Sequence, residues 1–179
     1  MFDRIGWYRT IGFQHLRFKR DFERDSLPDC PGAFVGTCDS SIAEWLSGML
    51  AERAEHPRFV YWLTLNSHLP VLAPSPDQLS ACATVPSLRG NSPLCSWQAL
   101  VSNVHSSLAH LAARVGRPTV LVIVGDHAPP FLDQRTRAQF SSTEVPYIVL
   151  IPTESMPPDI RSSTAKNRHP VYIKAGISQ

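Results

Sequence analysis

Two polar motifs each follow an apolar run that is typical of a buried strand. The run TVLVIV (119–124) is followed by one glycine and then by Asp126 and His127. The run FVYWLTL (59–65) is followed, three residues later, by His68. A carboxylate oxygen and an imidazole nitrogen adjacent in the chain suit Zn²⁺ or Mn²⁺, and the glycine lets the backbone turn toward one ion. The other interpretation is an ordinary turn in which Asp126 caps the segment that follows.

Ligands of an open parallel sheet bind beyond the carboxyl ends of its strands. The two motifs therefore lie at the same edge of the sheet, which we call the rim, only if the strands that carry them are parallel neighbours. A third apolar run, VPYIVLI (145–151), predicts another strand. The runs at 59–65 and 119–124 are apolar on both faces, as strands covered by helices on two sides are. We therefore expect an α/β fold with a mostly parallel sheet flanked by helices.

Two helices are predicted around the first strand. Ser41 and Glu44 form a capping box before an apolar face, in a helix that we expect to end near His56. An apolar stripe over 97–115 predicts a second helix, stopped by a glycine and a proline. The proline-rich stretch at 69–95 predicts a long excursion.

Composition excludes several classes of protein. Of the 179 residues, 43% are hydrophobic and 18% are charged, which excludes a disordered polyelectrolyte and a coiled coil. The net charge of +2 gives no reason to expect a nucleic-acid partner. The chain has no apolar run of about 18 residues, and its start lacks the charged-then-apolar pattern of a signal peptide. We expect a membrane anchor only in a longer precursor.

The four cysteines form two local pairs without a CxxC motif. Two disulfides, Cys30 with Cys38 and Cys82 with Cys95, are the simplest of the three possible connectivities. The alternative is four reduced thiols in a cytosolic protein. The second disulfide would pin the proline-rich excursion.

Several segments together resemble one family. VLVIVGDHAPPF contains Gly-Asp-His after a strand, FVYWLTLNSHLPV contains Thr-x-x-Ser-His-x-Pro, and VPYIVLIP follows both. With the helix between them, they resemble the sulfatase-like branch of the alkaline phosphatase superfamily, which includes lipoteichoic acid synthases and phosphoethanolamine transferases. MFDRIGWYRTIGF and FVGTCDSSIAEWL resemble two upstream segments of that branch. The resemblance covers about residues 2–152.

The resemblance implies roles for four residues. Asp126 and His127 would be ligands of Zn or Mn, and His68 would contact the oxygens of the substrate or protonate the leaving group. Arg4 would bind the phosphoryl group through its planar fork, although a solvated charge beside an aspartate explains it equally well. Leu69 stands where the family usually has glycine, which leaves the substrate open.

The family's nucleophile and its other acidic metal ligand precede the segment that resembles MFDRIGWYRTIGF. We therefore expect residues 1–152 to be the C-terminal portion of an alkaline-phosphatase-like catalytic domain that lacks the nucleophile, and 153–179 to be a loosely packed tail. The family would act as a metal-dependent transferase or hydrolase on an envelope phospholipid, a glycan or another phosphate or sulfate ester, on the periplasmic or extracellular face of the membrane. The alternatives are an inactive remnant and a non-catalytic module that binds an anion or a metal.

Overall fold

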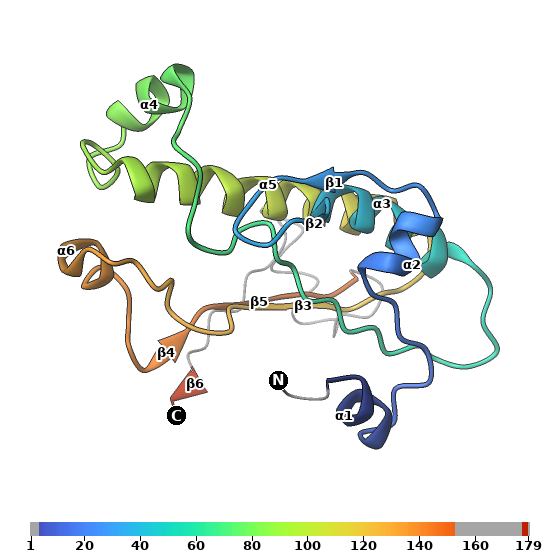
Figure 1. Cartoon of the computed structure of the whole chain (residues 1–179). Coiled ribbons are helices and arrows are strands. Elements are labelled where there is room, and N and C mark those ends of the chain that lie inside the picture. The colour runs from blue at the N-terminus through green and yellow to red at the C-terminus, as the bar shows by residue number, and fades with distance from the viewer. Residues whose placement is uncertain (1–3, 153–176, 179) are drawn as a thin grey trace, which may run out of the picture.

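The structure is a computed structural model that describes residues 4–152 and 177–178. Most of the predicted tail lies outside the described residues, and the division at residue 152 stays a prediction. Figure 1 shows the elements, which in chain order are α1 (Arg4–Thr10), α2 (Lys19–Arg24), β1 (Asp29–Cys30), β2 (Gly36–Thr37), α3 (Asp39–Ala51), α4 (Pro76–Ala83), α5 (Ser92–Arg114), β3 (Leu121–Val124), α6 (Gln134–Arg137), β4 (Glu144–Val145), β5 (Tyr147–Leu150) and β6 (Ile177–Ser178).

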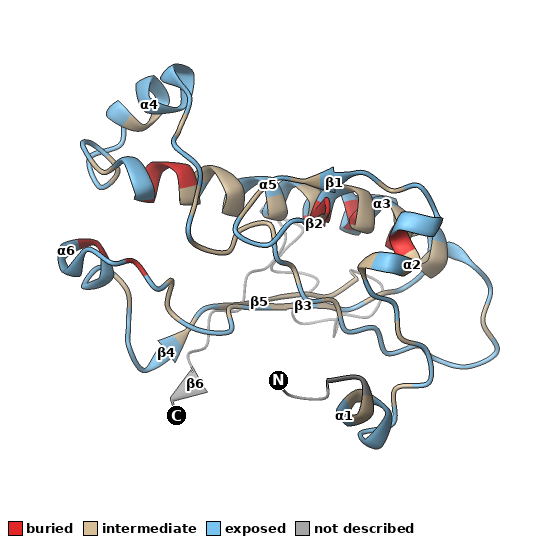
Figure 2. Cartoon of the chain, in the orientation of Figure 1, coloured by how far each residue is buried: buried red, intermediate tan, exposed pale blue. Residues whose placement is uncertain are grey.

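The main core lies where α3 and α5 pack side by side over the β3–β5 pair (Figure 1). Leu46 of α3 is buried against Leu108 and Leu111 of α5. Leu121 and Ile123 of β3 pack against this cluster from the sheet side. Figure 2 shows buried stretches on the helices, while β3 and β5 are half-buried or exposed. The helices therefore cover one face of a thin sheet.

Both predicted helices are present, with different ends. The helix predicted over 97–115 is confirmed in α5, which begins at Ser92 because the Asn91 side chain accepts a hydrogen bond from the N–H of Leu94 at 3.1 Å. The predicted capping box at Ser41 is wrong. Instead, α3 begins at Asp39 and ends at Ala51, well before His56.

The predicted parallel pairing is not what the described strands show. β3 pairs with β5 antiparallel, with Val124 opposite Tyr147, and the β1–β2 and β4–β6 pairs are antiparallel too. The segment from 125 to 146 leaves the end of β3 and returns to the same end of the pair, so β5 runs back in the opposite direction. The single strand predicted over 145–151 is divided into β4 and β5 at Pro146.

The segment 59–65 has no regular secondary structure and is not paired as a strand. Its expected burial on two faces is wrong, since Phe59 is 81% exposed and Tyr61 is 53% exposed. Trp62, which follows Tyr61, is half-buried and packs against the α3–α5 core. Apolar residues on both faces predicted a central strand, but most of these side chains are exposed.

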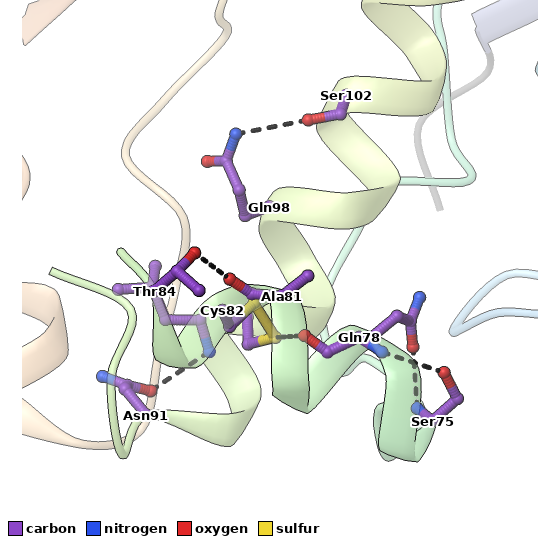
Figure 3. The surroundings of a disulfide bond; sticks show 10 residues. Ser75, Gln78, Ala81, Cys82, Thr84, Asn91, Gln98 and Ser102 are labelled. Atoms are coloured by element: carbon purple, nitrogen blue, oxygen red, sulfur yellow. Dashed lines mark hydrogen bonds between the residues drawn. A yellow bond between two sulfur atoms is a disulfide. The ribbon is translucent and has the colours of Figure 1, made fainter. Parts of the chain in front are cut away.

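Both disulfides are formed as the simplest pairing predicted, Cys30 with Cys38 and Cys82 with Cys95. The second one ties α4 to the first turn of α5, and so pins the excursion at 69–95 (Figure 3). The sequence reasoning missed α4, although its signal is present. Ser75 accepts from the N–H of Gln78 at 3.2 Å, and the Gln78 side chain accepts from the N–H of Ser75 at 2.8 Å.

Replacing Cys82 and Cys95 together by serine is expected to lower the free energy of unfolding by about 3 kcal/mol, by the loop-closure entropy of a cross-link over 13 residues. Urea unfolding of the variant and of the wild type measures the difference. Limited proteolysis should cut the variant first within 76–91, because the disulfide holds α4 to α5. Equal unfolding midpoints would show that the cross-link adds nothing to the stability of this arm.

Within the described ranges, 4–152 and 177–178, no helix combines the length and the apolar content that crossing a bilayer requires.

Candidate functional site

Asp126 and His127 stand on a turn fixed at the end of the β3–β5 pair. The N–H of Gly125 donates to the carbonyl of Pro146 at 3.0 Å, which continues the pairing by one residue. A Cβ at position 125 would lie 3.3 Å from Cδ of Pro146, so the close approach of the two chains favours glycine there. The turn therefore places Asp126 and His127 immediately outside the sheet.

The other side of this turn is anchored in a second apolar cluster. Phe131 is 4% exposed and packs edge-on against Trp97 of α5, with ring centroids 5.9 Å apart, and against Phe140. The two prolines between His127 and Phe131 restrict the backbone. With β3 at one end and Phe131 at the other, the loop that carries the metal-ligand candidates is held at both ends.

The side chains of Asp126 and His127 lie next to each other and face solvent. Their exposed fractions are 71% and 53%. Nδ1 of His127 lies 2.8 Å from the carbonyl oxygen of Ala128, and a carbonyl can only accept, so Nδ1 carries the proton. In the neutral ring Nε2 then has a free lone pair, 3.4 Å from Oδ2 of Asp126.

These two donor atoms fit a zinc ion. With ligand bonds of about 2.1 Å, two ligands of one tetrahedral zinc ion stand about 3.4 Å apart. A metal-binding histidine usually donates its other ring N–H to a carbonyl or carboxylate, as His127 does to Ala128. In the described part of the chain, however, no group of three or more His, Cys, Asp or Glu side chains is arranged to hold a metal ion.

His68 lies beside this pair, as its position after the 59–65 segment predicted. Its ring centroid is 6.4 Å from that of His127, and the two rings are nearly perpendicular. Nδ1 of His68 lies 2.5 Å from the carbonyl oxygen of Leu69, so it donates, and Nε2 is again the nitrogen left free. On the other side, Phe34 packs edge-on against the ring at 4.7 Å. The structure thus brings His68, His127 and Asp126 together.

Arg4 is the first residue of α1. The structure describes its backbone but not the surroundings of its side chain. Its role in binding a phosphoryl group stays a prediction, as do the catalytic role of His68 and the ligand roles of Asp126 and His127.

Sequence reasoning missed a buried carboxyl next to this site. Asp39 is 5% exposed, and burial raises the pKa of its carboxyl above the usual value, while hydrogen bonds from the N–H groups of Asn66 and Leu65 oppose that rise. Because the folded-state pKa is raised, this carboxyl contributes most to stability below its unfolded pKa of about 4. The contribution is lost as the pH rises through the folded-state pKa.

Comparison with known proteins gives one match. The family model described as Sulfatase matches residues 4–175, which is nearly the whole chain. Neither a curated protein nor a solved structure matches the sequence.

Proposed function

The chain belongs to the sulfatase family, whose members generally use a divalent metal ion and have an α/β fold of the alkaline phosphatase type. From this membership we propose that the chain carries part of the active site of an enzyme that transfers or hydrolyses phosphate or sulfate esters. Asp126 and His127 would hold Zn or Mn. The observation that carries the proposal is the 3.4 Å separation of Nε2 of His127 and Oδ2 of Asp126, with both Nδ1 atoms of the neighbouring histidines already bonded to carbonyls.

The ion and the side chains would have different roles in the reaction. A bound divalent ion polarises an ester oxygen and favours the deprotonated form of a nucleophile. His68 would contact the ester oxygens or give a proton to the leaving group through its free Nε2, because Nδ1 is held by Leu69. Arg4 would hold the phosphoryl or sulfuryl oxygens. The proposal assigns no nucleophile to this chain.

The substrate and the compartment follow from the resemblance of the motifs to envelope enzymes. We place the reaction on a phospholipid or a glycan at the periplasmic or extracellular face of a membrane. The two disulfides support an oxidising compartment.

The high exposure of Asp126 and His127 favours a second candidate, a module that binds a metal or an anion without turnover. One experiment separates the two. The purified chain is loaded with Zn²⁺ or Mn²⁺, its metal content is measured by elemental analysis, and chromogenic phosphate and sulfate esters are then added.

Turnover above a blank with the same free metal supports the enzyme, and the preferred ester decides between phosphate and sulfate. A stoichiometric metal without turnover supports the metal site that both candidates share, because the proposal assigns no nucleophile to this chain. Absence of both metal and turnover, in a sample shown to be folded by circular dichroism, overturns the metal site.

A further inference from the structure

The start of α3 and the segment that carries His68 are joined by a reciprocal pair of hydrogen bonds. The backbone N–H of Asp39 donates to Oδ1 of Asn66 at 2.6 Å. In return, the backbone N–H of Asn66 donates to Oδ2 of Asp39 at 3.1 Å. Each residue therefore satisfies the other's backbone N–H with its own side chain, across a sequence separation of 27 residues. We call this pair the Asp39–Asn66 clamp.

The α3 side of the clamp is rigid. Asp39 follows Cys38, which forms the disulfide with Cys30, and the N–H of Cys38 donates to the carbonyl of Pro28 at 2.9 Å. Asp39 is also the first residue of a helix of 13 residues, where the helix dipole favours a negative charge. The position of the Asp39 carboxyl group is therefore set by α3, and Asn66 is held in place relative to it.

The other side of the clamp is the turn that presents His68. The N–H of His68 donates to the carbonyl of Leu65 at 3.2 Å and closes a turn over 65–68. Oδ2 of Asp39 accepts from the N–H of Asn66, which is the second residue of that turn. After the turn, Nδ1 of His68 donates to the carbonyl of Leu69. The direction of Nε2 of His68 thus depends on a turn whose start is held by Asp39.

Besides the clamp, this turn is held by the ring contacts of His68 with Phe34 and His127. Leu65 is 40% exposed, and most side chains of the segment before it are exposed. Burial of the Asp39 carboxylate costs free energy, and its hydrogen bond to the backbone N–H of Asn66, which is stronger when the acceptor is charged, offsets that cost in part. The clamp is therefore a strong local restraint in a weakly held segment.

We infer that Asp39 is a positioning residue for His68: it fixes the 65–68 turn so that the ring, which lies beside that of His127, keeps its proton on Nδ1 and leaves Nε2 free. The role of His68 in turnover rests on the proposed function. The position and tautomer of its ring can be measured without any turnover. The positioning role of Asp39 and the role of His68 in turnover can therefore be contradicted independently.

The test compares Asp39→Ala and Asp39→Asn with Asp133→Ala as the matched control. Asp133 also accepts hydrogen bonds at a helix start, from the N–H and the hydroxyl of Thr136 at 2.7 Å, but at α6. Nitrogen-15 NMR at about pH 8, where an ordinary imidazole is neutral, reports the tautomers of His68 and His127. Hydrogen exchange reports the protection of the Asn66 amide.

In Asp39→Ala, exchange of the Asn66 amide should rise by at least about tenfold, the effect of losing a hydrogen bond to a charged acceptor. The His68 signals should move from the Nδ1–H tautomer toward a mixture, while those of His127 stay unchanged. Asp39→Asn keeps an acceptor oxygen and should preserve the tautomer. If Asp39→Ala does not fold, Asn66→Ala, which removes the other half of the clamp, should give the same shift of the His68 signals. A His68 tautomer that is unchanged in the folded clamp variant, or altered equally by Asp133→Ala, overturns the inference.

Discussion

Replacing Leu111 by alanine is expected to lower the free energy of unfolding by about 3–5 kcal/mol, the range found for buried leucines. Leu111 is 4% exposed and lies on α5, where it meets Leu46 of α3 and Leu108 one turn earlier. The described part of the chain has few buried apolar side chains, and the sheet beneath them is only two strands wide. A cavity at Leu111 would therefore loosen the cluster through which α3 and α5 pack against β3.

Leu132→Ala is the matched control for this change. Leu132 has the same side chain but is 99% exposed, so its truncation removes almost no buried surface. Urea unfolding followed by circular dichroism should give a control midpoint close to that of the wild type and a much lower one for Leu111→Ala. Equal midpoints for the two variants would contradict the packing of α3 against α5.

Local sequence signals predicted α3, α5 and the two disulfides. The apolar stripe of α5 repeats every three to four residues, and cysteines eight and 13 residues apart close loops of ordinary size. The same kind of local signal, the Ser75 and Gln78 box, marks α4. The predictions were wrong where the signal is not local. An apolar run does not encode the direction of its partner, so the antiparallel β3–β5 pair could not be read from its residues.

In the candidate site too, features with a local sequence signal were predicted and features without one were missed. Polar residues at the ends of two apolar runs predicted that His68 and Asp126–His127 would lie on one rim, and their rings and side chains do lie together. Asp39 gave no such signal, because its partner Asn66 is 27 residues away. An aspartate next to a cysteine at a helix start looks like an ordinary cap. Only the fold shows that it is buried and bonded to the turn of His68.

The strongest effect on function is expected at His127, where removal of the imidazole should weaken Zn²⁺ binding by at least about 100-fold. Loss of a residue that only supports a ligand costs 10–100-fold in metal affinity, and loss of a ligand atom should cost no less. Asp126→Ala should weaken Zn²⁺ binding to a similar extent, because Oδ2 of Asp126 lies 3.4 Å from Nε2 of His127, a separation that suits two ligands of one ion.

Isothermal titration with Zn²⁺ above pH 7 measures this prediction, because the imidazole must be neutral to bind a metal. His105→Ala is the matched control for the imidazole, since His105 is exposed on the surface of α5, and Asp77→Ala on α4 is the control for the carboxylate. Both controls should bind Zn²⁺ as the wild type does. An equal loss of Zn²⁺ affinity in all four variants would indicate non-specific binding to surface side chains. An unchanged affinity in His127→Ala and Asp126→Ala would remove the metal site from the proposed function, since the geometry that supports it depends on these two donor atoms.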